Sequence, residues 1–365
     1  MKDGHISFLS MVVVVLVGLL LGFVVLLITD ASQALPALWI ILSFGLSSLR
    51  NFGDVLYFAT PIIMTGLSVG FAYKTGLFNI GASGQFTFGS FVAIYVVLQW
   101  DALPPNIRII VALLMAMLAG ALWGAIPGLL KTYRNVHEVI SCIMTNYIGI
   151  FLVNFLILNT VFYPMRAQTQ RIPSATQMPI WGLDYIFRDA TRASSINASF
   201  IIAIVSALLV YIILERTSFG YELKACGFNR DAAKYAGINE KKSIISSMMI
   251  SGALAGLGGG MFFLSGAGRA MNVADVLAPE GFMGISVSLL GMHHPIGIVF
   301  SGILVSYLGR GGFNIQALGF AQEIIDIAIA VTIYFCAFVL LVKAHLSKIL
   351  GFIGKLKPDK EGGEA

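Results

Sequence analysis

The chain has 365 residues, of which 58% are hydrophobic and only 11% are charged, with a formal net charge of +5. A soluble globular domain carries about 25% charged residues, so this chain lacks the ionised groups that cover a water-exposed surface. Soluble enzymes, nucleic-acid-binding proteins and disordered scaffolds are therefore excluded. The sequence predicts an all-α, polytopic membrane protein with about ten transmembrane helices, each of ~20 apolar residues.

Ten apolar windows predict the membrane spans. The first holds 21 uncharged residues from Phe8 to Ile28, which is longer than the ~7–15 residues of a signal-peptide core. The stretch 36–49 is too short to span and is predicted to be re-entrant or interfacial. Windows 280–292 and 295–310 are also short, and predict either two tilted helices or one broken hairpin. The ten windows are 7–29, 55–73, 84–100, 107–130, 139–160, 199–214, 243–265, 280–292, 295–310 and 321–342.

Basic residues indicate the orientation of the chain in the membrane. Lysine and arginine concentrate at 215–242 and after residue 342, on the side of the N-terminus if ten helices cross. The positive-inside rule then places both termini in the cytoplasm. We expect one transmembrane domain, 1–365, with an extracytoplasmic loop at 161–198, a cytoplasmic loop at 216–242 and a cytoplasmic tail at 343–365.

The sequence contains no ATP site of its own. The longest cytoplasmic segment has about 28 residues, too few for an ATPase fold, and no phosphate-binding loop is present. The three cysteines are widely spaced and form no metal-binding motif. We therefore expect no enzymatic activity and no cofactor bound by this chain; ATP and Mg would bind to a separate ATPase subunit.

Two predicted helices carry a glycine at every fourth position. Such stripes let helix backbones approach closely in a membrane, where lipid offers no hydrophobic drive between helices. A gating or sliding contact is the functional interpretation, and tight packing is the structural one that we favour. The glycines are Gly120, Gly124 and Gly128, and then Gly252, Gly256 and Gly260.

The segment 74–85 is interrupted by three glycines between two predicted spans. Non-helical backbone at membrane depth is tolerated only inside protein or against a water-filled cavity. This pattern predicts a broken helix that lines a solute pathway, with Asn79 and Gln85 as neutral hydrogen-bonding groups. Phe86 and Phe88 follow and could stack on a planar ligand, although packing against lipid or protein is the commoner role.

Polar residues also mark two other helices. Glu138, Cys142, Thr145 and Asn146 share one helical face, which favours a cavity; the alternative is a cap by Glu138 and interhelical hydrogen bonds by the others. Glu323 and Asp326 begin the last helix, where they could bind a coupling ion or simply interact with the helix dipole. The pair His293-His294 is only weak evidence for a metal site.

The stretch 215–242 predicts a short docking helix outside the membrane. Asn229 is a good N-cap, and Gly237 suits the position after the helix end, where φ > 0 is common. The helix should cover about 230–236, with small residues that allow close approach to a partner. The expected coupling residues are Asp231, Ala232, Ala233, Tyr235, Ala236 and Gly237.

Four motifs in order carry a resemblance to a known family. The stretch Asp231–Gly237 resembles the EAA-xxx-G coupling loop of permease subunits in ABC importers. Leu77–Gln85 is similar to the "LFNIGAEGQ" motif of the branched-chain amino acid, ribose and nucleoside permeases. His137–Ser141 with Asn146 resembles the "NEVIS…N" helix start of that branch, and Gly281–Gly291 with His294-Pro295 its "GFDGIAVALLG…HP" segment. Three departures are Ser83 for the usual Glu, His137 for Asn and Met283 for an acidic or polar residue.

The resemblance implies a permease of a bacterial ABC importer, located in the inner membrane and closest to nucleoside permeases. Its partners would be a cytoplasmic ABC ATPase, a second permease chain, expected to be a different related one, a solute-binding lipoprotein or periplasmic protein, and the lipid bilayer. Nucleic acid is not expected as a partner. A neutral path through Asn79, Gln85, Phe86, Phe88, Glu138 and Asn146 suits a nucleoside, with riboflavin or a sugar as the alternative. The rival of another class is an ion-coupled secondary transporter that uses Glu323 and Asp326; a membrane-embedded enzyme lacks any recognisable catalytic grouping.

Overall fold

The computed structural model describes residues 3–190, 192–266, 269–336, 338–339 and 341–345. Most of the predicted tail at 343–365 therefore lies outside the described residues. The chain divides into two compact units, one of Ile40–Asn314 and one that joins Met1–Trp39 to Ile315–Ala365. Each unit is described by itself.

The smaller unit is built on two long apolar helices, α1 (Asp3–Thr29) and α14 (Gln322–Cys336). They pack closely because Gly18 and Gly22 of α1 lie against the backbone of α14. The Thr332 hydroxyl donates to the Gly18 carbonyl oxygen at 3.1 Å. The short helix η4 (Ile315–Leu318) precedes α14.

The stretch predicted to be re-entrant or interfacial forms a separate short helix, α2 (Ala31–Ser43), followed by η1 (Phe44–Leu46). Asp30 begins it, since its carboxylate accepts hydrogen bonds from the Ser32 hydroxyl and backbone N–H at 2.7 and 2.9 Å. These bonds hold the pKa of Asp30 below its usual value, and the bond from the Ser32 hydroxyl has the largest effect. The division between the two units falls within α2, after Trp39.

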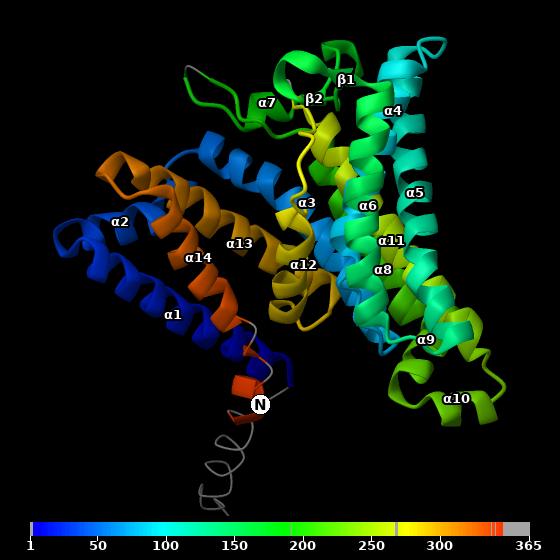
Figure 1. Ribbon diagram of the computed structural model, residues 1–365. Helices are drawn as coiled ribbons and strands as arrows, with labels where there is room; N and C mark the ends of the chain where they lie inside the picture. Colours follow the sequence, from blue (N-terminus) through cyan, green and yellow to red (C-terminus); the bar gives the residue numbers. More distant parts are fainter. Residues whose placement is uncertain (1–2, 191, 267–268, 337, 340, 346–365) are drawn as a thin grey trace, which may run out of the picture. The chain divides into compact units, whose positions relative to one another are not determined.

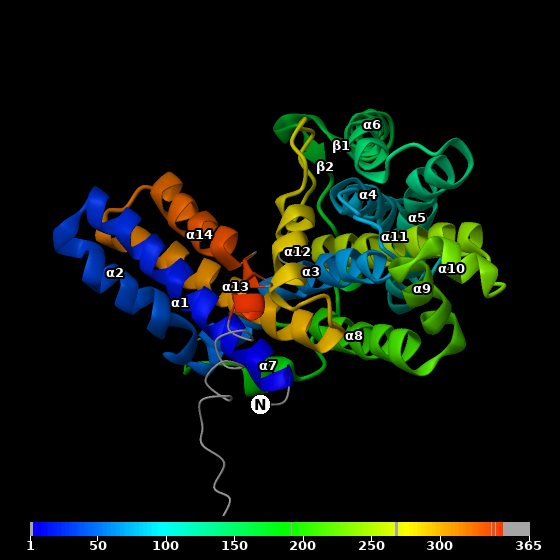
Figure 2. The same ribbon diagram turned by 90° about the horizontal axis from the view of Figure 1, so that it is seen from below.

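The larger unit is organised around α3, which is buried along most of its length. Helices α8, α11, α12 and α13 all pack on α3, and α11 also packs on α4 and α5 (Figures 1 and 2). The helices are α3 (Leu49–Lys74), α4 (Ala82–Gln99), α5 (Pro105–Arg134), α6 (Glu138–Thr160), α8 (Ala198–Arg216), α9 (Ser218–Phe228), α10 (Arg230–Tyr235), α11 (Glu240–Leu264), α12 (Pro279–Leu290) and α13 (Pro295–Asn314).

Each of the ten predicted windows contains a helix. Among the described residues, seven helical stretches are long and apolar enough to cross a membrane. The helices α4, α12 and α14 fall short of that limit in length or apolarity, so the number of crossings stays a prediction. The seven are Leu9–Thr29, Leu49–Lys74, Pro105–Arg134, Glu138–Thr160, Ala198–Arg216, Glu240–Leu264 and Pro295–Leu318.

The two glycine stripes face each other across the α5–α11 contact. A Cβ atom added at Gly252 would lie 2.2 Å from the Gly120 carbonyl oxygen, and one at Gly256 would lie 2.4 Å from the Ala116 carbonyl oxygen. Only hydrogen fits at these positions. The stripes are therefore a close-packed interface between α5 and α11, as the packing interpretation predicted.

Irregular segments interrupt the larger unit at residues 75–81 between α3 and α4, and at the described residues 265–266 and 269–278 between α11 and α12. The helices that follow them begin against each other. The Ser83 hydroxyl donates to the Ala278 carbonyl oxygen at 2.9 Å, and a Cβ at Gly281 would lie 2.4 Å from the Ser83 Cα. Ser83, which replaces the usual Glu, is thus buried in the contact between the starts of α4 and α12.

A tight turn joins α12 to α13, so windows 280–292 and 295–310 form two separate helices, of which α12 is short and α13, at 20 residues, is longer than predicted. Met292 and His293 both have positive φ, +52° and +55°. The buried His293 ring stacks on Tyr73 with centroids 3.6 Å apart, and its Nδ1 lies 2.9 Å from the Ser288 hydroxyl. Within the described residues, no group of three or more metal-ligating side chains occurs, here or elsewhere.

The segment 161–198 forms a small cap at the end of the larger unit opposite α10 (Figure 1). Strands β1 (Phe162–Tyr163) and β2 (Gln168–Thr169) pair in antiparallel fashion, with Phe162 opposite Thr169. The Thr169 N–H also donates to the Met271 carbonyl oxygen at 2.9 Å, which ties the cap to the irregular segment before α12. The cap also holds η2 (Pro164–Arg166), η3 (Ser174–Thr176) and α7 (Leu183–Ile186).

Candidate functional site

The docking helix expected at about 230–236 is present as α10 (Arg230–Tyr235), and a second short helix, α9, precedes it. The Asn229 side chain accepts a hydrogen bond from the Ala232 N–H at 3.0 Å, as an N-cap residue should. Gly237 has φ +83°, and its N–H donates to the Lys234 carbonyl oxygen at 3.0 Å. Local sequence signals alone therefore set both ends of α10.

The outer surface of this helix pair is aromatic. Phe228 and Tyr235 are 92% and 95% exposed, and aromatic rings are enriched at protein–protein interfaces. Asp231, Ala232 and Ala236 are also exposed. Ala233 corrects our expectation that all three alanines face a partner, because it is only 4% exposed and is buried within its own chain.

The helix pair α9–α10 lies against residues 75–81, the irregular segment between α3 and α4. Gly227, near the end of α9, lies on the turn after α3: a Cβ there would be 2.4 Å from the Lys74 carbonyl oxygen and 3.0 Å from the Gly76 nitrogen. Gly76 has φ +70° and faces Gly227 in return. Two backbones thus touch directly, so a displacement of α9 acts on residues 75–81 without an intervening flexible side chain.

Asn79 and Gln85 lie inside the protein, bound to each other and to neighbouring helices. Asn79 Nδ2 donates to Gln85 Oε1 at 2.8 Å and to the Ser251 hydroxyl of α11 at 2.6 Å. The Ser251 hydroxyl donates in turn to the Ser68 carbonyl oxygen of α3 at 2.7 Å. Asn79 and Gln85 are at most 1% exposed, so these amides connect α3, α4 and α11 across the broken segment.

Asn146 of α6 holds the same segment from the other side. Its Oδ1 accepts from the Gly84 N–H at 2.8 Å, and its Nδ2 donates to the Ile80 carbonyl oxygen at 3.1 Å. The irregular backbone before α4 would otherwise leave these groups unsatisfied. Asn146 therefore serves as the cap that the broken helix cannot supply.

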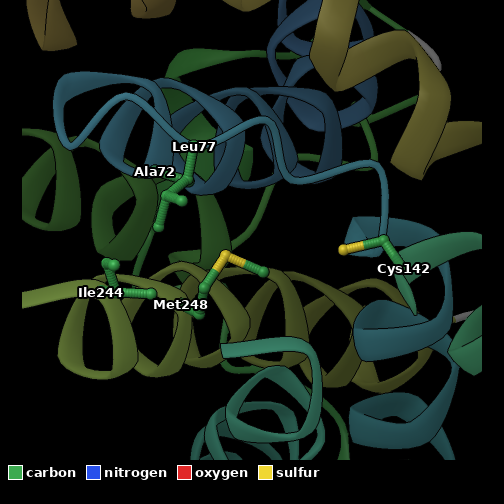
Figure 3. Packing of buried hydrophobic residues seen from close by; sticks show 5 residues of the cluster. All are labelled: Ala72, Leu77, Cys142, Ile244 and Met248. Atoms are coloured by element: carbon green, nitrogen blue, oxygen red, sulfur yellow. The ribbon is translucent and has the colours of Figure 1, made fainter. Parts of the chain in front are cut away.

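An apolar cluster lies beside this hydrogen-bond network, at the end nearest to α9 (Figure 3). Its buried members come from the end of α3, the broken segment, α6 and α11, with Ile80 packed against them. It joins the broken segment to the helices on either side. The members are Ala72, Leu77, Cys142, Ile244 and Met248.

Replacing Asn79 with leucine tests whether Asn79 stabilises the fold or contacts the transported solute. Leucine is of similar size but leaves the Gln85 amide without its partner and removes one hydrogen bond from Ser251, at a cost of ~1–3 kcal/mol for each buried polar group left unpaired. We expect the purified protein to unfold at a lower temperature, with an unchanged KM for solute in the folded fraction. Asn159→Leu, which removes an exposed amide from α6, is the control. A raised KM at unchanged stability would instead place Asn79 in the pathway.

The two predicted stacking residues have different surroundings. Phe88 stacks on Trp123 of α5, with ring centroids 4.6 Å apart, while Phe86 is buried beside Phe262 of α11 at 5.8 Å. Phe86, but not Phe88, lines a cavity of about 250 Å³ between α4, α6, α11 and the start of α12. The cavity is lined by Phe86, Thr87, Ile150, Asn154, Phe262, Phe263, Met271, Asn272, Ala274, Val276, Leu277, Ala278, Pro279 and Glu280.

Glu138 lies in the first turn of α6 and is paired. Lys131 near the end of α5 approaches its carboxylate at 2.8 Å, and both side chains are at most 14% exposed. Its backbone carbonyl oxygen also accepts from the Ser141 hydroxyl at 3.0 Å. This geometry joins α5 to α6 and leaves Glu138 away from Phe86 and its cavity.

Glu323 and Asp326 lie in the first two turns of α14, and both are exposed. Asp326 accepts a hydrogen bond from the Gln322 side-chain amide at 2.7 Å. A desolvated ion site needs buried carboxylates with further oxygen ligands. The surroundings of these two residues fit an interaction with the helix dipole instead.

Sequence reasoning did not single out Glu280 or Arg269. Glu280 follows Pro279 at the start of α12 and lines the cavity beside Phe86. The Arg269 guanidinium lies 3.9 Å from the centroid of the Phe262 ring and 5.2 Å from that of Tyr57. A proline and an acidic residue after an irregular segment would have been the available signal for Glu280, since together they mark a helix start.

These features define a multi-pass helical membrane protein with broken helices in its core and a short, exposed helix pair that rests on one of the breaks. The chain belongs to the family described as branched-chain amino acid transport system / permease component, whose model matches residues 51–344.

Three relatives illustrate the similarity. The guanosine ABC transporter permease protein NupP of Bacillus subtilis is 37% identical, with 89% of this chain and 91% of the relative covered. The nucleoside ABC transporter permease protein NupB of Lactococcus lactis is 35% identical, with 88% of each chain covered. The guanosine ABC transporter permease protein NupQ of B. subtilis is 26% identical, over 84% of this chain and 93% of the relative. No solved structure matches this chain.

Proposed function

We propose that this protein is a permease subunit of an ABC importer and forms the membrane path for a nucleoside, driven by a separate ATPase subunit. The observation that carries the proposal is the helix pair α9–α10. Its aromatic rings Phe228 and Tyr235 are exposed, and Gly227 contacts Gly76 in the irregular segment 75–81. The printed functions of NupP and NupB supply the solute class.

The partners follow from the same proposal. The ATPase binds ATP and Mg and docks on α10, so that end of the larger unit faces the cytoplasm of a bacterial inner membrane. The distribution of basic residues supports placing both chain termini on the cytoplasmic side as well. A solute-binding lipoprotein or periplasmic protein delivers the nucleoside at the cap of residues 161–198. The second permease is a different, related chain, as the pair NupP and NupQ in B. subtilis suggests.

Uptake by cells tests the solute class. Cells that express the two permeases, the ATPase and the binding protein should accumulate labelled guanosine, and deletion of this chain should abolish the accumulation. Excess unlabelled nucleosides should compete, while riboflavin and glucose should not. Competition by riboflavin or glucose alone would replace the nucleoside with that solute.

The ion-coupled alternative has its own test. Replacing Glu323 and Asp326 together with Gln and Asn should leave ATP-dependent uptake within about twofold of wild type, as exposed substitutions change free energies by only ~0.5 kcal/mol. The double variant is compared with wild type in cells with and without the ATPase. Uptake that persists without the ATPase and is lost in the double variant would support a secondary transporter.

A further inference from the structure

The cavity beside Phe86 combines aromatic walls with one carboxylate. Phe86, Phe262 and Phe263 supply rings from α4 and α11, and the Phe262 and Phe263 rings meet edge to face at 5.1 Å. Among the described residues that line the cavity, Glu280 is the single charged one. Flat apolar walls around few polar groups are typical of sites for planar ligands.

The position of Glu280 places its carboxylate at a break in the membrane helices. Pro279 begins α12, and six residues of the irregular backbone between 271 and 278 line the cavity. Such backbone at membrane depth is tolerated where it lines a cavity, and half-helix starts of this kind recur at substrate sites in transporters. The helix dipole alone favours an acidic residue in the first turn, but it does not require that residue to line an aromatic cavity.

The Glu280 carboxylate remains available to a ligand. In the part of the chain that the structure describes, no basic group lies within ion-pairing distance of it. Arg269 is the nearby cation whose charge acts on Glu280, but its guanidinium lies over the Phe262 ring and does not line the cavity. Both carboxylate oxygens can therefore accept hydrogen bonds from a bound molecule.

We propose that this cavity holds the base of a purine nucleoside during transport and that Glu280 selects guanine. The inference rests on the proposed function. A carboxylate accepts two parallel hydrogen bonds from the N1–H and the amino group on the Watson–Crick edge of guanine. Adenine offers one donor and one acceptor there, so a carboxylate pairs with it poorly. At about 250 Å³ the cavity is below the ~300–1,000 Å³ of sites for whole drug-sized ligands, which suits a base with its sugar outside.

Asn154, a polar residue that lines the cavity, can bind the sugar of the nucleoside. Asn154 of α6 donates from Nδ2 to the Asp275 carboxylate at 2.9 Å and to the Ala274 carbonyl oxygen at 3.2 Å. Its side-chain oxygen takes part in none of the hydrogen bonds found among the described residues, and it can accept one from a ribose hydroxyl. The aromatic rings and the carboxylate lie on the base side, and the amide on the sugar side.

The test compares maximal uptake rates of guanosine and adenosine by the complete transporter, at concentrations that saturate the binding protein. Glu280→Gln keeps the size of the side chain but replaces one acceptor oxygen with a donor. We expect guanosine uptake to fall about tenfold, the discrimination typical of one bidentate base contact, while adenosine uptake stays unchanged or rises. Glu323→Gln, an exposed acidic residue on α14, is the matched control and should alter neither rate.

A second variant keeps the proposal testable if Glu280→Gln fails to assemble. Glu280→Asp retains the carboxylate on a shorter side chain, and it should transport guanosine more slowly than wild type but still in preference to adenosine. Equal changes for both nucleosides in the assembled variant would overturn the role of Glu280 and leave the nucleoside permease intact. A wild-type transporter that moves no nucleoside would refute the proposed function itself.

Discussion

Gly252→Val should abolish the folded protein. The valine Cβ would lie 2.2 Å from the Gly120 carbonyl oxygen and 3.1 Å from the Gly124 Cα, and both are backbone atoms that cannot rotate away. Overpacking of an ordinary core costs ~1–3 kcal/mol, and a backbone-to-backbone clash in the middle of the α5–α11 contact should exceed that range. We expect the variant to be inserted but to aggregate on extraction into detergent, as measured by size-exclusion chromatography.

Gly309→Val is the matched control for this prediction. Gly309 also lies in a long apolar helix, α13, but a Cβ there meets no atom within 4 Å. The control should elute as a single species with a normal unfolding temperature. If Gly252→Val gave the same yield and stability as Gly309→Val, the α5–α11 interface would not have the close packing described here.

The double variant Phe228→Asp and Tyr235→Asp should remove ATPase binding. Both rings are more than 90% exposed in this chain, and buried aromatic anchors at interfaces contribute ≥ ~2 kcal/mol each, or about a 30-fold change in affinity. The permease itself should fold normally, since neither ring is buried in it. Copurification with the ATPase and solute-stimulated ATP hydrolysis measure the loss.

Two comparisons define this test. Tyr185→Asp changes another largely exposed ring, 75% exposed, in the cap at the other end of the larger unit. This variant should leave ATPase binding unchanged. Ala233→Asp is expected to act differently from the surface pair, because Ala233 is buried within its own chain and the charge should disrupt α10 itself. Normal copurification of the Phe228 and Tyr235 double variant would place the ATPase contact elsewhere.

Features set by local chemistry could be predicted from the sequence. Asn229 and Gly237 mark the ends of α10 because a side-chain cap and a positive φ depend on one or two residues. The glycine stripes predicted a close helix contact because spacing alone places Gly252 and Gly256 on one face. Apolar runs located each long helix, although α3 begins at Leu49, six residues before its predicted window 55–73.

Features that depend on how distant helices meet could not be predicted. Asn79 and Ser251 are 172 positions apart and form a hydrogen bond, so no local pattern shows that this amide is satisfied inside the protein. Ala233 was expected on the partner side, since the sequence of a six-residue helix does not show which face its neighbours bury. Glu280 and Phe86 come together only through the meeting of α4 and α12, and the cavity between them has no signature in either helix.

The most direct test of the proposed function uses purified subunits in sealed vesicles. This permease, its permease partner and the ATPase are reconstituted with the binding protein outside, and labelled guanosine is supplied with ATP and Mg or with ADP and Mg on the ATPase side. The account predicts guanosine accumulation with ATP alone, independent of any proton or sodium gradient, and none with ADP. Accumulation that follows an ion gradient and ignores ATP would contradict it.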